Sequence, residues 1–199
     1  DGDGIGQLLT KLDTPQEYKQ LSEALTEATQ NAVFAALAAE LKPALVEPSD
    51  ARREDRETVV RGDTILIHPF DIITIGGDDV LLIVPADFAL SIAKRIGEAF
   101  GGSLTPVVQS LLKNPKATAS MSAGVVLADD HTPIQMLFQL ATDLLKKGAK
   151  KKGGALDFHL LKSVDMVDGN ITAMREQYPY YIEKVGDNFQ DLRLLGRPY

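Results

Sequence analysis

Acidic residues gather at two predicted turns, where their spacing indicates metal chemistry. Asp1 and Asp3 lie in the Gly-rich opening DGDGIGQLLT, and the string Gly-Gly-Asp-Asp ends at Asp78 and Asp79. Carboxylates that converge without a basic partner repel one another and raise each other's pKa values. A divalent cation removes this conflict, and oxygen ligands suit hard ions such as Mg²⁺ or Mn²⁺. These four carboxylates are therefore predicted to form a metal site that holds two such ions.

Glycines flank both acidic turns and leave the backbone bare for a nucleotide. Gly76 and Gly77 permit positive φ and a close approach of a bulky ligand. Gly2 does the same in the opening turn, whose N–H groups can hold phosphate oxygens. The basic run KKGAKKK adds five lysines within seven residues of a chain whose net charge is −7. A lysine that reaches a triphosphate stabilises charge in the transition state, so the predicted reaction is two-metal phosphoryl or nucleotidyl transfer.

Each of these motifs also has an ordinary structural interpretation. Gly-Gly-Asp-Asp is a common hairpin turn, a lysine run is often a solvated helix end, and DGDG could be a solvated terminal segment. Their joint occurrence, in this order, favours a site. The three histidines, His68, His131 and His159, are scattered, and none is expected to pair with a carboxylate at metal spacing.

The elements that must position these residues follow from periodicity and from turn signals. Thr14, Pro15 and Glu17 predict a capping box at the start of a long helix. Predicted helices cover residues 15–42, 87–100 and 133–147, and predicted strands cover 65–67, 72–75, 80–84, 119–127 and 155–161. Gly101-Gly102 is predicted to stop the second helix. Residues 43–62 are predicted as a loop, and 163–199 as irregular with one possible helix.

This order predicts an α+β fold with a ferredoxin-like palm, β-α-β-β-α-β with an added α-β, in which helices cover one face of an antiparallel sheet. A first strand that ends at Asp1 is inferred to complete the plan. In such a sheet the first strand neighbours the central hairpin, so the end of that strand and the tip of the hairpin meet at one rim. The fold therefore predicts that the four carboxylates converge.

Composition excludes several other classes of protein. The chain has 199 residues, 44% of them hydrophobic, and no cysteine, which excludes disulfides, thiolate zinc sites and a cysteine nucleophile. Its sequence pI of about 5.0 disfavours non-specific nucleic-acid binding. No run approaches the roughly 20 apolar residues of a membrane span. We expect a cytoplasmic protein without a membrane partner, and a first residue other than Met suggests a piece of a longer chain.

Several ordered motifs together resemble a known family. IGGDDVLLIVP, DGDGIGQLL, MSAGVVLA, LLKKGAKKKGGALDFHLL and the closing RPY are similar to the second palm domain of the large subunit of type III CRISPR effector complexes. Gly-Gly-Asp-Asp also corresponds to the GGDEF signature of the more distant diguanylate cyclases. The resemblance covers residues 1–162 as a palm domain, and 163–199 are expected to lead towards a following domain.

The resemblance implies a nucleotidyltransferase that converts ATP into cyclic oligoadenylates for antiviral defence. It also implies partners: other effector subunits, a guide RNA, and the target RNA that switches synthesis on. Family members make product between two palms, so this palm alone is expected to bind nucleotide, with turnover depending on the second palm. Two alternatives stay open. One is a stand-alone GGDEF-like cyclase, although Asp79-Val80 stands where that family has Glu-Phe. The other is a non-catalytic palm scaffold.

Residue roles carried over from the family are as follows. The hairpin metal pair is Asp78 and Asp79, and the carboxylate at the end of the first strand is Asp1, which gives the three catalytic residues. Asp3 is a neighbour or a second metal ligand. The nucleotide-binding residues are Gly76, Gly77, Gly2 and Lys150, the last of which is implied to meet the triphosphate.

Overall fold

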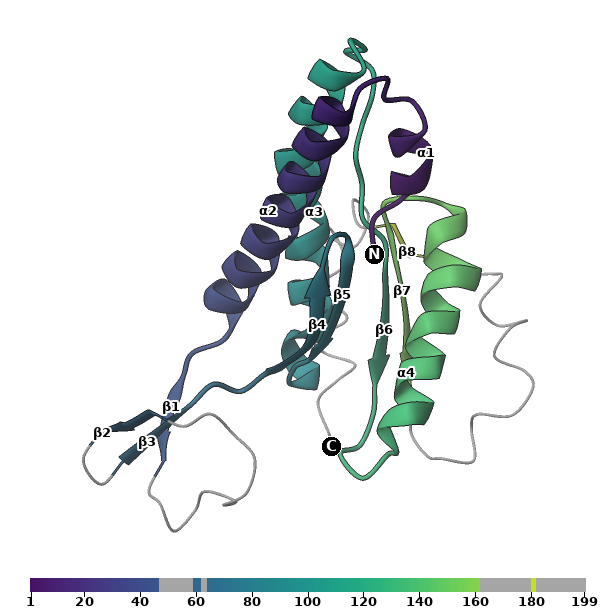
Figure 1. Ribbon diagram of the computed structural model, residues 1–199. Coiled ribbons are helices and arrows are strands. Elements are labelled where there is room, and N and C mark those ends of the chain that lie inside the picture. Colours follow the sequence, from purple (N-terminus) through teal and green to yellow (C-terminus); the bar gives the residue numbers. More distant parts are fainter. Residues whose placement is uncertain (47–58, 62–63, 162–179, 182–199) are drawn as a thin grey trace.

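The computed structural model describes residues 1–46, 59–61, 64–161 and 180–181 (Figure 1). Its helices are α1 (Ile5–Leu9), α2 (Pro15–Glu40), α3 (Ala86–Leu111) and α4 (Ile134–Asp143), and α4 continues into a π-helical turn (Leu144–Gly148) and a 3₁₀ turn (Ala149–Lys151). Its strands are β1 (Ala44–Val46), β2 (Val59–Arg61), β3 (Thr64–Ile67), β4 (Asp71–Gly76), β5 (Asp79–Ile83), β6 (Ala123–Leu127), β7 (Ala155–Leu160) and β8 (Tyr180–Tyr181). This mixture of helices and small sheets confirms the predicted α+β palm class.

Helix α2 begins at the predicted capping box. The backbone N–H of Glu17 donates to Thr14 Oγ1 at 3.3 Å, and Glu17 Oε2 accepts from the Thr14 N–H at 2.9 Å. These backbone donors, Thr14 first and then Asp13, lower the pKa of Glu17 because they stabilise its charged form. Pro15 occupies the first helical turn, where its missing N–H leaves no partner unsatisfied.

Helix α3 extends well past the residue at which glycines were predicted to stop it. Gly101 and Gly102 lie inside the helix, which also contains Pro106. The apolar face continues beyond the glycines, since Leu104 and Val108 are fully buried. Burial of this face outweighs the roughly 1 kcal/mol that each glycine costs a helix. The prediction of a helix end at residue 100 is therefore wrong.

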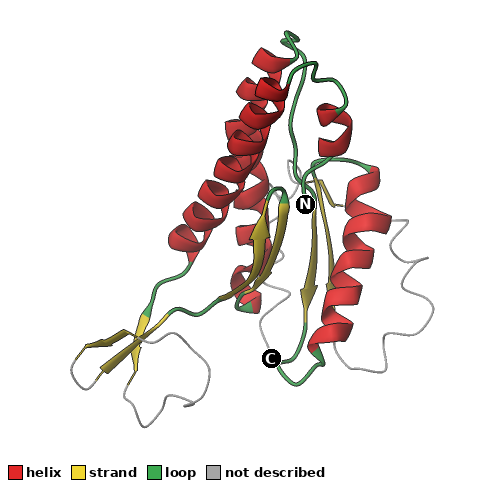
Figure 2. Ribbon diagram, in the orientation of Figure 1, coloured by secondary structure: helices red, strands yellow, loops and turns green. Residues whose placement is uncertain are grey.

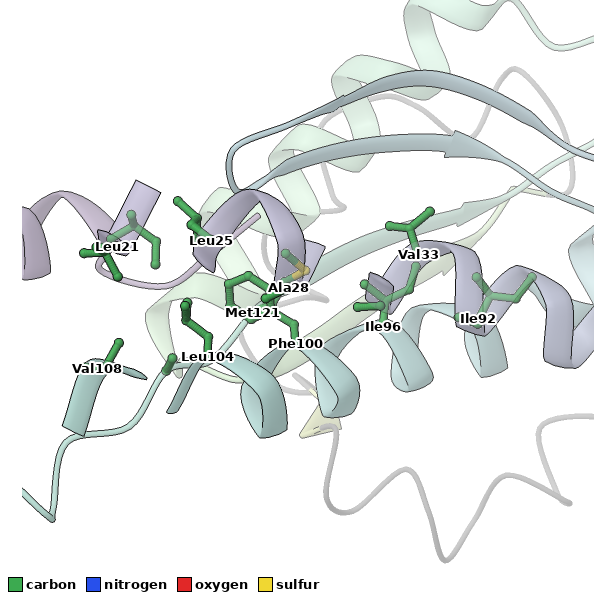
Figure 3. Close-up of a cluster of buried hydrophobic side chains, with 14 of the residues drawn as sticks. Leu21, Leu25, Ala28, Val33, Ile92, Ile96, Phe100, Leu104, Val108 and Met121 are labelled. Carbon is green, nitrogen blue, oxygen red and sulfur yellow. The ribbon is translucent and has the colours of Figure 1, made fainter. Parts of the chain in front are cut away.

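The main core lies between α2 and α3 (Figure 3). Its α2 side chains include Leu21, Leu25, Ala28 and Val33; α3 contributes Ile92, Ile96, Phe100, Leu104 and Val108; and Met121 joins them from the segment before β6. The inner face of the β4–β5 hairpin packs on the same cluster through residues such as Ile72, Val80 and Leu82. The helix pair therefore fixes the hairpin, and with it the tip that carries Asp78.

The strands form separate small sheets (Figure 2). β4 and β5 pair antiparallel around the turn Gly77-Asp78, with Gly76 opposite Asp79. β3 pairs with β1 and β2, so the two predicted strands 65–67 and 72–75 belong to different sheets. β1 and β2 also lie in the stretch predicted as a loop, and the rest of 43–62 is largely outside the described residues.

The strands β6 and β7 are parallel, which corrects the prediction of an entirely antiparallel sheet. The reason is the crossover through α4, which returns the chain to the end of the sheet where β6 began. Helix α4 packs closely on β6 at Gly124, since a side chain there would collide with the Ala141 carbonyl, and the close approach therefore requires glycine. β8, in the predicted C-terminal extension, pairs antiparallel with β7. The proposed helix in 163–199 lies outside the described residues.

None of the helices in the described part of the chain is both long and apolar enough to cross a membrane.

Candidate active site

The opening residues are held beside the segment that leads into β6. Gly2 forms an antiparallel bridge with Met121, and backbone N–H groups of Asp3 and Ser122 donate to the carbonyls of Ser120 and Asp1 at 2.9 and 3.0 Å. Figure 1 shows the N-terminus between the hairpin tip and the start of β6. This ladder fixes Asp1 and Asp3 at the rim of the fold. The strand expected to end at Asp1 stays a prediction.

Gly2 brings the opening segment against the hairpin tip. It is buried, and a Cβ atom there would lie 2.9 Å from Asp78 Cβ, 3.1 Å from Asp78 Oδ2 and 2.7 Å from Ile5 Cγ1. A side chain at this position would therefore push Asp78 or Ile5 aside. The bare backbone that was predicted to admit a nucleotide is, in this structure, the surface against which Asp78 packs.

Asp78 and Asp79 themselves occupy the turn and the first position of β5. Residue Asp78 is half-buried and residue Asp79 is exposed. Neither carboxylate has a hydrogen-bond or ion-pair partner among the residues that the structure describes. Gly77 has φ +58°, a conformation that favours glycine, and nothing lies within 4 Å of a Cβ placed at Gly76 or Gly77. The hairpin tip thus presents two unpartnered carboxylates beside open backbone.

Lys150 pairs directly with Asp1. Its Nζ donates to Asp1 Oδ1 at 2.6 Å and to the Gly2 carbonyl at 3.2 Å, and the two side chains are 31% and 21% exposed. The π-helical turn that follows α4 delivers this lysine, since the chain passes straight from it into the 3₁₀ turn that contains Lys150. The structure therefore joins the predicted triphosphate lysine to the predicted metal site, and Asp1 has the basic partner that the sequence argument left out.

Asp3 bonds to a different set of residues from Asp1. Its Oδ2 accepts from Ser120 Oγ at 2.7 Å, Ser122 Oγ at 3.0 Å and the Gly154 backbone N–H at 2.7 Å. Its Oδ1 is buried and has no hydrogen-bond partner within the described part of the chain. The described residues therefore engage one oxygen of Asp3 and supply no donor to the other.

The acids act together on one point of the site. Burial and then Lys150 lower the pKa of the Asp1 amino group, whereas Asp78, Asp3 and Asp79 raise it. Three carboxylates therefore contribute negative potential at the same position. Their ligand atoms are nevertheless farther apart than in a closed metal site, because no three of the four predicted acids have carboxylate oxygens within 4.8 Å of one another.

A different group in the described residues does meet that spacing: Asp129, Asp130 and His131. The expectation that no histidine pairs with a carboxylate is therefore wrong for His131, whose Nδ1 lies 3.7 Å from Asp130 Oδ1. Three adjacent residues of ligand type were the available signal. All three are exposed, and the backbone N–H of His131 donates to Asp129 Oδ1 and so lowers the pKa of Asp129. Since exposed acidic turns are common without an ion, we assign this group no ligand.

The fold and the site define a palm domain, and the chain matches the family model described as Cas10/Cmr2, second palm domain, over residues 1–156. The chain therefore belongs to the Cas10/Cmr2 family, which confirms the resemblance inferred from the motifs. A curated relative, the CRISPR system Cmr subunit Cmr2 of Pyrococcus furiosus, is 32% identical over 154 residues. The match covers 77% of this chain and 15% of that relative.

Proposed function

We propose that this palm domain is the nucleotide-converting part of a CRISPR-associated large subunit, and that it joins ATP molecules into cyclic oligoadenylates. The observation that carries this proposal is the meeting of Asp1, Asp78 and Lys150 around Gly2, from segments that are far apart in the sequence. The unpartnered carboxylates of Asp78 and Asp79, with a lysine beside a glycine turn, are the kinds of group that bind a metal–nucleotide complex.

The residues fit divalent ions in their donor chemistry. Carboxylate oxygens of Asp1, Asp78 and Asp79 suit Mg²⁺ or Mn²⁺. The proposal places two ions at this site. When bound, such ions lower the pKa of an attacking hydroxyl and offset charge on a leaving pyrophosphate.

The protein groups have distinct parts in the proposed reaction. A 3′-hydroxyl of one ATP forms a bond to the α-phosphorus of another, the bond to the bridging oxygen breaks, pyrophosphate leaves, and the hydroxyl proton passes to solvent. Lys150 leaves Asp1 and neutralises the leaving phosphates. Gly76 and Gly77 let the nucleotide approach the turn backbone, where a side chain would obstruct it. No side chain is required as general base.

The wider setting of the proposal follows from the family. A large subunit in the cytoplasm would assemble with other effector subunits, a guide RNA and a target RNA, and its product would act in antiviral defence. The chain covers a small part of its relative, so the second palm and the assembled complex belong to the activity proposed for the whole protein.

Calorimetric titration tests the site without the second palm. ATP and GTP are titrated into the 199-residue chain with and without Mn²⁺, and the same titrations are repeated with Asp78→Asn/Asp79→Asn. We expect Mn²⁺-dependent ATP binding that weakens more than about tenfold in the double variant, since each lost charged ligand contact is worth roughly 1.5–3 kcal/mol.

The matched control is Asp129→Asn/Asp130→Asn, which removes the same charge from the exposed acidic turn. It should leave ATP binding unchanged. Binding that survives in Asp78→Asn/Asp79→Asn, with circular dichroism showing a folded chain, contradicts the assigned site. Absence of binding by the folded wild-type chain favours the scaffold function instead.

A further inference from the structure

Asp3 ties together two segments that are distant in the sequence. Its Oδ2 accepts three hydrogen bonds, two from the serines that precede β6 and one from the glycine that precedes β7. A carboxylate has about four acceptor positions over its two oxygens, so three donors on one oxygen leave no room there for another. Oδ2 of Asp3 is therefore committed to the protein itself.

Ser122 links Asp3 to the first residue of β7. Ser122 is completely buried, and its Oγ donates to Asp3 and also accepts from the Ala155 N–H at 3.4 Å. Gly154 lies in the same place: a Cβ added to it would make ordinary contact with Ser120 Cβ at 3.4 Å, and its φ of +56° favours glycine. Partly buried, charge-assisted hydrogen bonds such as those to Asp3 hold backbone segments in one arrangement.

The turn between Lys150 and Gly154 is short and closed. The N–H groups of Lys152 and Gly153 both donate to the Ala149 carbonyl, at 3.1 and 3.2 Å. Lys150 at one end of this turn bonds to Asp1, and Gly154 at the other end bonds to Asp3. Asp1 and Asp3 are two residues apart, so the turn and the opening segment form a closed ring of contacts.

We infer that Asp3 is a positioning residue, which acts through the Gly154 turn to place the Lys150 ammonium beside Asp1. The inference deepens the proposed function, because it explains how the phosphate-binding lysine is held at the metal site before a nucleotide arrives. It also separates the two roles that the sequence left open for Asp3, as neighbour or as metal ligand.

Competitive acylation of lysines, read by mass spectrometry, tests this placement in the absence of any nucleotide. In the wild-type chain Lys150 should react more slowly than the exposed Lys151, since its ammonium is held by a carboxylate and a carbonyl. Asp3→Ala should raise the acylation rate of Lys150 about fivefold, as expected for release of an ion pair worth roughly 1 kcal/mol. The rates of Lys146 and Lys151 should not change.

A second variant guards against loss of the fold, because Asp3→Ala leaves two serines and an N–H without their acceptor. Ser120→Ala removes one of the three donors, and Ser103→Ala, at an exposed position of α3, is its control. Ser120→Ala should accelerate Lys150 alone, and Ser103→Ala should accelerate none. An unchanged acylation rate of Lys150 in folded Asp3→Ala and folded Ser120→Ala overturns the inference. A faster acylation of every lysine reports unfolding and also counts against specific placement of Lys150.

Mn²⁺ and ATP titrations then separate this inference from the proposed function. In a Lys150→Met background, Asp3→Ala should alter ATP affinity by less than about twofold, because positioned and positioning groups act as one unit. A further large loss, or a loss of Mn²⁺ binding without nucleotide, would make Asp3 a metal ligand and overturn the positioning role. Failure of the wild-type chain to bind ATP would refute the proposed function, while the acylation result would stand.

Discussion

Lys150 should have opposite effects on two ligands of the same site. Its ammonium occupies Asp1 Oδ1, so a metal ion that uses Asp1 has to displace it. A bound nucleotide, by contrast, offers the lysine a new anionic partner in its phosphates. Lys150→Met retains most of the side-chain volume and removes the charge. We therefore expect the variant to bind Mn²⁺ alone more tightly than the wild type and to bind ATP with Mn²⁺ more weakly.

The geometry sets the size of both effects. The pair is short, with Nζ and Oδ1 2.6 Å apart, but its side chains are 31% and 21% exposed. A fully buried charged hydrogen bond is worth about 1.5–3 kcal/mol and an exposed pair about 0–1 kcal/mol. About 1 kcal/mol for this partly exposed pair predicts a gain of about fivefold in Mn²⁺ affinity. Loss of one charged contact to the triphosphate predicts a loss of about tenfold in ATP affinity.

Electron paramagnetic resonance measures the first effect, because the signal of aqueous Mn²⁺ falls as the ion binds. Calorimetry in saturating Mn²⁺ measures the second. Lys151→Met removes the same charge from the adjacent exposed residue, so it controls for the general change in surface potential. Equal changes in Mn²⁺ affinity for the two variants, or weaker Mn²⁺ binding in Lys150→Met, would refute the competition between lysine and metal at Asp1.

Three further predictions concern the helices that support the site. Gly102→Ala should stabilise the chain by up to about 1 kcal/mol, which corresponds to a rise of about 2–4 °C in the melting temperature. Gly101→Ala should stabilise the chain less, because its Cβ would lie 3.1 Å from the Ala119 carbonyl. An equal gain in melting temperature for the two variants would contradict this packing. Thr14→Ala should lower stability by about 1 kcal/mol. Glu17 has a lowered pKa, so its stabilisation is present above its ordinary value of 4.5 and is lost as pH falls through the lowered value. The melting temperature of Glu17→Gln should therefore lie below that of the wild type at neutral pH, and this gap should shrink in acid. A gap that stays the same at all pH values would refute the stabilising role of the charged Glu17 cap.

Features set by neighbouring residues could be predicted from the sequence. The capping box at Thr14 and the hairpin around Gly77-Asp78 depend on residues within a few positions, so their signals are local. Convergence of Asp1 with Asp78 required one more step, which was the order of elements in a palm. The structure places Gly2 against Asp78, as that order suggests, but it does not bring three of the four acids to metal spacing.

Features set by distant contacts could not be predicted in this way. Helix α3 passes Gly101-Gly102 because its buried face continues, and burial depends on residues of α2 and on Met121. The parallel pairing of β6 and β7 depends on how α4 crosses the sheet. The bonds of Asp3 with Ser120, Ser122 and Gly154 join residues more than 100 positions apart, and no periodic pattern marks them.

The charge balance of the site bears on the number of ions proposed for it. The side chains alone, four carboxylates and the Lys150 ammonium, leave a formal charge of minus three around Gly2, which would repel a triphosphate. One divalent cation still leaves the cluster negative, and a second reverses the sign. Since Asp1 is neutralised by Lys150 and Asp3 is engaged by hydrogen-bond donors, the repulsion falls mainly on Asp78 and Asp79. Under the proposed function, the demand for cations is therefore strongest at the hairpin tip, where the carboxylates have no partner among the described residues, and two ions would be the smallest number that reverses this formal charge.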